Sequence, residues 1–162
     1  MRILGVDPAL STTGYGVIDY SKNKMSLIEA GVIKTSSGDA LPQRLKKIYR
    51  AVIALINDTQ SEILVLEMLY AHWRHPTTAF LLGEARGVIC LASAACGIKL
   101  VEYPATRVKK AIVGRGHASK EQVQRMITHT LALKAAPRYS DITDALALAI
   151  THGRIMQSNP VR

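Results

Sequence analysis

Four acidic residues lie at positions where their side chains could act together. Asp7 and Glu67 each end a short apolar run, and Asp141 and Asp144 lie at the start of the last helical stretch. A strand that is buried on both faces ends in a carboxylate where that end opens into a cleft. Acids that converge there repel one another, and bound divalent cations are the usual remedy. The pattern therefore predicts metal-assisted chemistry at one edge of a sheet.

Each acid alone also has a simpler interpretation. Asp141 could be a helix-terminal acid that the macrodipole stabilises by about 0.3–1 kcal/mol. Asp7 could be a loop acid before Pro8, and Glu67 could be an ion-pair partner. Asp141 and Asp144, however, are three residues apart and share a helix face. Phosphodiester hydrolases use two Mg²⁺ ions about 3.5–4 Å apart, and carboxylate oxygens are suitable ligands for them. The joint pattern favours a two-metal site, and the sequence has no Cys and His cluster suited to zinc.

The rest of the chain is basic. Its 162 residues include 21 Lys and Arg against 12 Asp and Glu, which gives a formal net charge of +9. If four of the acids form one site, the remaining surface is strongly positive, as is typical of nucleic-acid binders. A basic composition can also simply serve solubility. We expect one domain spanning residues 1–162, because this length supports a single core.

The cysteines and the apolar segments bear on cellular location. Cys90 and Cys96 lie in an apolar stretch without CxxC spacing, which predicts buried thiols in a reducing compartment. We expect no signal peptide and no apolar run long enough to cross a bilayer. The expected protein is cytoplasmic and nucleoid-associated, with no membrane partner.

Hydrophobic periodicity predicts five strands and five helices. The predicted strands are residues 2–7, 14–20, 25–35, 63–67 and 99–103. The predicted helices begin after Pro42, near Thr77, after Pro104, after Ser119 and near Ser140. Three antiparallel strands followed by alternating strands and helices indicate an α/β fold with a mixed five-stranded sheet flanked by helices.

The helix predicted near residues 77–95 carries a stripe of small residues. The stripe consists of Ala79, Gly83, Gly87, Cys90 and Ala94. Glycine in a helix interior costs about 1 kcal/mol, so two of them imply a packing reason. The stripe would let another backbone approach closely, either the sheet beneath or a twin helix across a dimer.

Short motifs along nearly the whole chain resemble the RuvC family of Holliday-junction resolvases. They are Asp7-Pro8, residues 13–17, Leu66-Glu67, residues 82–87, Val108-Lys109, Val113-Gly114, residues 118–120, Gln122-Val123 and residues 144–152. The resemblance implies an RNase H-like fold and a homodimer that acts in DNA recombination and repair. It also implies Mg²⁺-dependent nicking of two opposed strands of a four-way junction, with Mn²⁺ able to substitute, and 5′-phosphate and 3′-hydroxyl products.

The resemblance also assigns roles to single residues. Asp7, Glu67, Asp141 and Asp144 fall on the family's metal-binding carboxylates, and Lys120 matches a lysine close to the active site. Lys109 matches a lysine that helps activity, and Tyr70 matches an aromatic residue that stacks on bases, which is worth about 1–3 kcal/mol per base. The expected DNA contacts are Tyr70, Trp73, Arg74, Arg107, Lys109, Lys110, Arg115 and Lys120.

The sequence departs from the family pattern in two places. Ala9 stands where the family has glycine, and residues 71–76 replace a stretch that carries Asn and a Ser-Ala pair. Trp73 in that stretch is either a second stacking ring or a cover for the start of the following helix.

Other functions share parts of this pattern. Another RNase H-like nuclease or a strand transferase would use the same carboxylates, and a catalytically silent junction-binding protein would keep the basic surface. An actin-like phosphotransferase would also begin with an acid-bearing strand, but the chain is short for paired domains and lacks a Gly-rich phosphate loop. Family membership would make a branch-migration motor a plausible partner.

Overall fold

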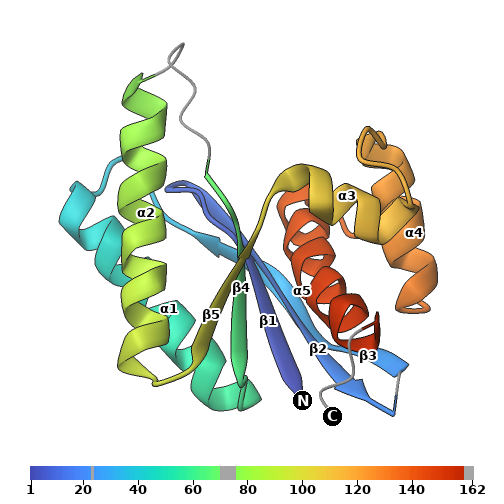
Figure 1. Cartoon of the computed structure of the whole chain (residues 1–162). Helices are drawn as coiled ribbons and strands as arrows, with labels where there is room; N and C mark the ends of the chain where they lie inside the picture. Colours follow the sequence, from blue (N-terminus) through green and yellow to red (C-terminus); the bar gives the residue numbers. More distant parts are fainter. Residues whose placement is uncertain (23, 70–75, 159–162) are drawn as a thin grey trace.

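The computed structural model describes residues 1–22, 24–69 and 76–158 and consists of a central sheet with helices on both sides (Figure 1). The strands are β1 (Arg2–Asp7), β2 (Thr12–Ser21), β3 (Lys24–Lys34), β4 (Ile63–Glu67) and β5 (Lys99–Tyr103). The helices are α1 (Leu41–Thr59), α2 (Pro76–Ala95), α3 (Ala105–Val113), α4 (Lys120–Thr130) and α5 (Ser140–Ser158). The predicted α/β architecture is confirmed.

The sheet has the strand order β3-β2-β1-β4-β5. The first three strands pair antiparallel, whereas β1, β4 and β5 pair parallel. Strand β1 is therefore central, and its last residue, Asp7, pairs with Gly14 of β2. Because β1 and β4 run in the same direction, Asp7 and Glu67 end at the same edge of the sheet, as predicted.

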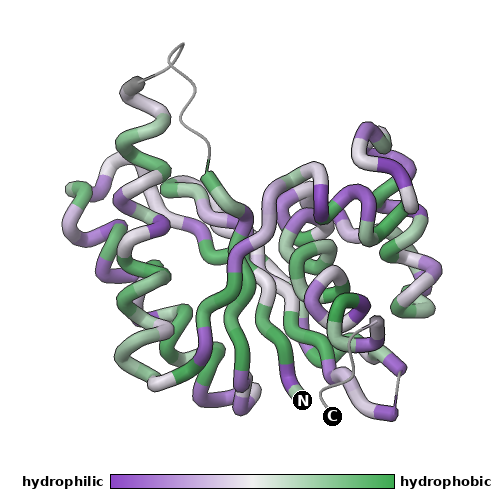
Figure 2. Tube along the Cα trace, in the orientation of Figure 1, coloured by the Kyte–Doolittle hydropathy of each residue, from purple (hydrophilic) through white to green (hydrophobic). Residues whose placement is uncertain are grey.

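Each face of the sheet has its own hydrophobic core. Helices α1 and α2 cover one face, and α3, α4 and α5 lie over the other (Figure 1). Alternation along β1 sends Ile3 into the core beneath α5 and Leu4 into the core beneath α1 and α2. Figure 2 shows mostly hydrophobic colouring along the central strands, as expected for strands that are covered on both faces.

Glycines in β1 and β2 bring α5 directly onto the sheet. A Cβ atom on Gly5 would overlap the carbonyl oxygen of Ala145, and one on Gly14 would overlap the backbone of Asp141. The absence of side chains at these positions lets the first turns of α5 lie against the carboxyl end of β1. This close approach places Asp141 and Asp144 at the same edge as Asp7.

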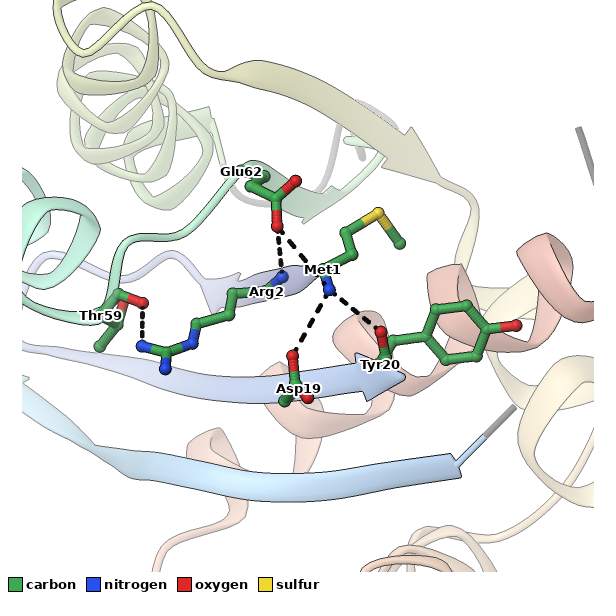
Figure 3. A network of polar contacts seen from close by, with 6 residues as sticks. All are labelled: Met1, Arg2, Asp19, Tyr20, Thr59 and Glu62. Carbon is green, nitrogen blue, oxygen red and sulfur yellow. Dashed lines mark hydrogen bonds and ion pairs between the residues drawn. The ribbon is translucent and has the colours of Figure 1, made fainter. Parts of the chain in front are cut away.

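The opposite end of β1 is held by polar contacts (Figure 3). The amino group of Met1 lies 3.5 Å from Asp19 Oδ1 and 3.8 Å from Glu62 Oε1. The backbone N–H of Arg2 donates to Glu62 Oε1 at 2.9 Å, and the Arg2 side chain donates to the carbonyl oxygen of Thr59 at 2.6 Å. Asp19 and Glu62 therefore anchor β1 between β2 and β4, at the end of the sheet away from Asp7.

Helix α2 corrects one prediction about membranes. By length and composition alone, the helical stretch Thr77–Ala95 is long and apolar enough to cross a bilayer. Within the fold, 22% of this stretch is buried. Ala85, Ile89 and Ala92 are among its buried residues, and they pack in the core shared with α1. The expectation that no apolar run has sufficient length was wrong, because this helix is apolar on its exposed side as well.

The two glycines of the small-residue stripe on α2 do not face the sheet. A Cβ atom built on Gly83 or Gly87 would meet nothing within 4 Å. Phe80 and Leu91, on the same helix, are 73% and 58% exposed. Of the two predicted explanations for the glycines, packing against the sheet is wrong.

Candidate active site

Three of the predicted acids line one cavity at the carboxyl edge of the sheet. The cavity has a volume of about 310 Å³ and opens where β1 and β4 end. Its charged lining residues are Asp7, Glu67, Lys109, Lys120 and Asp144. Two strands, α3, α4 and α5 thus each contribute a charged side chain to one place, although these residues are far apart in the sequence.

Burial and like charge raise the pKa values of these acids. The pKa of Asp7 rises to about 7, mainly because the carboxyl is buried and then because Asp144, Asp141 and Glu67 carry negative charge nearby. Burial is also the largest cause of the raised pKa values of Glu67 and Asp144. Burial and mutual repulsion therefore disfavour the ionised forms of these carboxyls.

Asp141 lies beside the cavity. Its backbone packs against Gly14, and its charge raises the pKa values of Asp7 and Asp144. It occupies the first turn of α5, where the helix dipole favours an acid. Asp141 is thus the peripheral member of the group, one turn before Asp144.

The donor set fits a hard divalent cation. Carboxylate oxygens are the ligands that Mg²⁺ and Mn²⁺ prefer, and a bound cation would offset the burial and the repulsion that raise the pKa of Asp7. Within residues 1–22, 24–69 and 76–158, no three Asp, Glu, His or Cys side chains are already close enough to hold a metal ion. The acids are gathered in one cavity, and a cation would have to draw their side chains together.

Lys120 reaches the cavity from the start of α4. Ser119 caps this helix through a capping box with Gln122, which fixes Lys120 in the first turn. The Lys120 ammonium lies 3.9 Å from Asp144 Oδ2 and its side chain is 77% exposed. An exposed pair of this kind contributes little stability, so the lysine is free to contact a ligand at the cavity mouth.

Arg86 supports the end of β4 and was missed by the sequence analysis. Its guanidinium donates a hydrogen bond of 2.7 Å to the backbone carbonyl of Glu67 and forms an ion pair with Glu102. The side chain is only 13% exposed. Arg86 thereby ties helix α2 to the two strand ends beside the cavity. The sequence signal that could have revealed this role is that Arg86 is a basic residue on the otherwise apolar side of α2.

A buried pair joins β5 to α5. The Tyr103 hydroxyl and His152 Nδ1 lie 2.7 Å apart, and burial lowers the pKa of His152. His152 is buried, with 5% of its surface exposed. The pair helps to hold α5 in place against the parallel half of the sheet.

The loop after Asp7 tolerates alanine at position 9. The Thr13 hydroxyl donates to the Ala9 carbonyl at 2.6 Å, and Ala9 does not have the positive φ that favours glycine. Alanine therefore fits this loop without backbone strain.

The other predicted DNA contacts are spread over the molecule. Arg107 and Lys110 line a separate cavity of about 800 Å³ beside Arg154, and Arg115 is exposed between α3 and α4. Tyr70, Trp73 and Arg74 lie outside the described residues.

The sheet order and the acids at its carboxyl edge define an RNase H-like protein. The model of the family described as "Crossover junction endodeoxyribonuclease RuvC" matches residues 3–152. The chain belongs to the RuvC family, as the sequence motifs predicted.

Individual relatives agree with this assignment. The RuvC of Rhodopirellula baltica is 42% identical over 98% of this chain and 89% of its own. The RuvC of Alkaliphilus metalliredigens is 45% identical over 94% of this chain and 92% of its own. The structure of Thermus thermophilus RuvC in complex with Holliday junction substrate matches with a TM-score of 0.91 at 32% identity, covering 98% of this chain and 96% of that chain.

Proposed function

We propose that this protein is an endonuclease that cuts two opposed strands of a four-way DNA junction by metal-dependent hydrolysis. The observation that carries the proposal is the single cavity lined by Asp7, Glu67 and Asp144, because acids that are partly buried together and repel one another suit divalent cations. Membership of a family of crossover junction endodeoxyribonucleases supports it. A junction complex of the Thermus thermophilus relative supports the choice of substrate.

Asp7, Glu67 and Asp144 would hold two Mg²⁺ ions, with Asp141 as the more replaceable ligand. Such ions, when bound, activate water and stabilise the leaving oxygen in phosphodiester hydrolysis. Asp7 would be the shared ligand, because the other three acids all act on its pKa. Mn²⁺ would substitute, because it prefers the same oxygen ligands.

Lys120 and Lys109 would act on the DNA. Both lysines line the cavity. Their positive charges partly offset the rise in the pKa values of Glu67 and Asp144. Lys120, at the mouth, would offset the charge that builds on the scissile phosphate. Lys109 would favour the ionised forms of the acids and hold the strand beside the cut. Hydrolysis would leave 5′-phosphate and 3′-hydroxyl ends.

Two copies of the chain would pair through α2. The exposed Phe80 and Leu91, together with the open space above Gly83 and Gly87, leave an apolar helix face without a partner in the described structure. A twin helix could approach closely there, because glycine lets backbones come together. A homodimer would supply the two active sites that paired nicking needs.

The cellular setting follows from the substrate. A junction resolvase would act in the cytoplasm at the nucleoid, with a branch-migration motor as a partner that moves the junction. The basic surface, with a formal net charge of +9, suits contact with DNA.

A substrate panel tests the proposal. Synthetic four-way junction, linear duplex and RNA–DNA hybrid of related sequence would be incubated with the protein and Mg²⁺, and the products resolved on denaturing gels. We expect symmetric nicks in the junction and little cutting of the other substrates. Preferential cutting of the hybrid would indicate a different RNase H-like nuclease, and binding of the junction without cutting in Mg²⁺ or Mn²⁺ would indicate a silent junction-binding protein.

A further inference from the structure

We propose that Lys34, Arg138 and Tyr139 form a contact for the DNA phosphate backbone on the β3 side of the active site. These three residues, the Tyr139 cluster, include none of the DNA contacts expected from the sequence. The inference rests on the proposed function, because it assumes that junction DNA crosses this edge of the sheet.

The Tyr139 cluster lies at the same sheet edge as the acids. Lys34 is the last residue of β3, and Tyr139 directly precedes α5. The α5 residue Asp141 packs against Gly14, and Gly14 pairs with Asp7. The cluster is thus next to the catalytic acids, on the side of β2 and β3.

Among the described residues, the geometry of the cluster leaves the proton of the Tyr139 hydroxyl without an acceptor. The Lys34 ammonium donates to the Tyr139 hydroxyl oxygen at 2.9 Å and lies 4.6 Å from the ring centroid. The Arg138 guanidinium carbon lies 5.7 Å from the same centroid. Because the hydroxyl oxygen accepts from Lys34, its own proton is available for an external acceptor such as a phosphate oxygen.

The two cations of the cluster carry positive charge that is not balanced locally. In the part of the chain that the structure describes, neither Lys34 nor Arg138 forms an ion pair with a carboxylate. Two cations held around one tyrosine form an unbalanced positive site, and the oxygens of a phosphodiester backbone complement it.

The cluster adds a second group of cations beside the acids. Lys109 and Lys120 line the cavity from α3 and α4, and the Tyr139 cluster lies on the other side, at β3. The acids therefore lie between two groups of cations. A DNA strand held at both groups would pass directly over Asp7, with its scissile phosphate at the metal-binding carboxylates.

The test measures junction affinity against salt concentration in metal-free buffer, where no cutting occurs. Lys34→Gln and Arg138→Gln are compared with Lys24→Gln, because Lys24 is an exposed lysine at the opposite end of the same strand. Removing one lysine or arginine that binds a phosphate should flatten the slope of log affinity against log salt by about 0.9. We expect this for both cluster variants, and a wild-type slope for Lys24→Gln.

Two further variants separate binding from folding. Lys34→Arg keeps the charge and should retain the wild-type slope. Tyr139→Phe removes only the hydroxyl, and it should weaken binding by about 2–5-fold with an unchanged slope, as expected for one neutral hydrogen bond. Thermal unfolding of each variant should stay close to that of the wild type.

The possible outcomes distinguish this inference from the proposed function. If the wild type binds the junction while Lys34→Gln and Arg138→Gln have the slope of Lys24→Gln, the Tyr139 cluster is not a DNA contact and only this inference fails. If the wild type does not prefer the junction over duplex DNA, the proposed substrate itself is wrong.

Discussion

Asp7 is the residue at which the fold and the function conflict. Burial and three neighbouring acids raise its pKa to about 7, so folding favours its protonated form. The folded pKa lies above the unfolded value of 3.8, and the metal-free protein should therefore lose stability as the pH rises from about 4 to about 7. A bound cation would reverse this penalty by pairing with the ionised carboxylate.

Replacing Asp7 with asparagine should stabilise the metal-free protein at pH 8. The change removes a buried charge that is repelled by its neighbours, and the expected gain is on the order of 1–3 kcal/mol. The melting temperature would be followed by calorimetry in the presence of a chelator. At pH 4, where Asp7 is already largely protonated, the variant and the wild type should melt at nearly the same temperature. An equal difference at both pH values would mean that Asp7 does not titrate as proposed.

Lys120 should set the pH dependence of cutting. It lowers the pKa values of Asp7, Glu67 and Asp144, so Lys120→Gln should leave all three harder to ionise. We expect a slower reaction, by about 10–100-fold, whose rise with pH is shifted to higher pH. Single-turnover cleavage rates across a pH series provide the measurement. If the rate of Lys120→Gln rises over the same pH range as that of the wild type, even from a lower value, Lys120 and the acids are not coupled.

At the scale of elements, Arg86 connects helix α2 to the proposed active site. Its hydrogen bond holds the carbonyl of Glu67 and its ion pair holds Glu102, so it sets the position of the ends of β4 and β5. The other side of α2 carries the exposed apolar residues. Helix α2 therefore lies between the proposed dimer contact and the strand that carries Glu67.

Arg86→Ala should lower the cleavage rate more than the junction affinity. Loss of a largely buried hydrogen bond to Glu67 should also cost about 1–3 kcal/mol of stability. Arg86→Lys should recover part of the stability, but it lacks the planar fork that contacts both partners. Arg50→Ala, which removes an exposed arginine from α1, is the control for both measurements. A fall in affinity equal to the fall in rate would assign Arg86 to DNA binding instead.

The ends of strands and helices could be predicted where residues close together in the sequence determine them. Strand β1 ends at Asp7 as predicted because its apolar run stops there, and α4 begins after Ser119 because the residues of the capping box are close together in the sequence. The second strand begins at Thr12, earlier than predicted, because its first residues pair with the end of β3. The contacts of Arg86 with Glu67 and of Tyr103 with His152 span 19 and 49 residues, so no local pattern reveals them.

For the whole molecule, the distribution of charge and apolar surface accounts for the proposed assembly on DNA. Three acids are gathered into one cavity within a chain of formal net charge +9. Helix α2 lies on the side of the sheet away from α5 (Figure 1), so two copies that paired through α2, as we propose, would leave the cavity open.

The proposed dimer can be tested at the two glycines of α2. Gly83→Leu with Gly87→Leu would fill the space that a twin helix needs, and the molar mass in solution should fall from that of two chains to that of one. Light scattering after size-exclusion chromatography measures this mass. Ala54→Leu adds the same side chain to the exposed surface of α1 and should leave the mass unchanged. A doubly substituted variant that remains a dimer would exclude close packing at these glycines.

The most direct test of the whole account compares Asp7→Asn with the wild type on one synthetic four-way junction. With Mg²⁺ present, the wild type should nick two opposed strands, and the variant should bind the junction at least as tightly yet leave it uncut, because a negative charge near the phosphates has been removed. Cleavage by the variant at the wild-type rate would contradict the account, since hydrolysis would then proceed without the carboxylate on which the metal site depends.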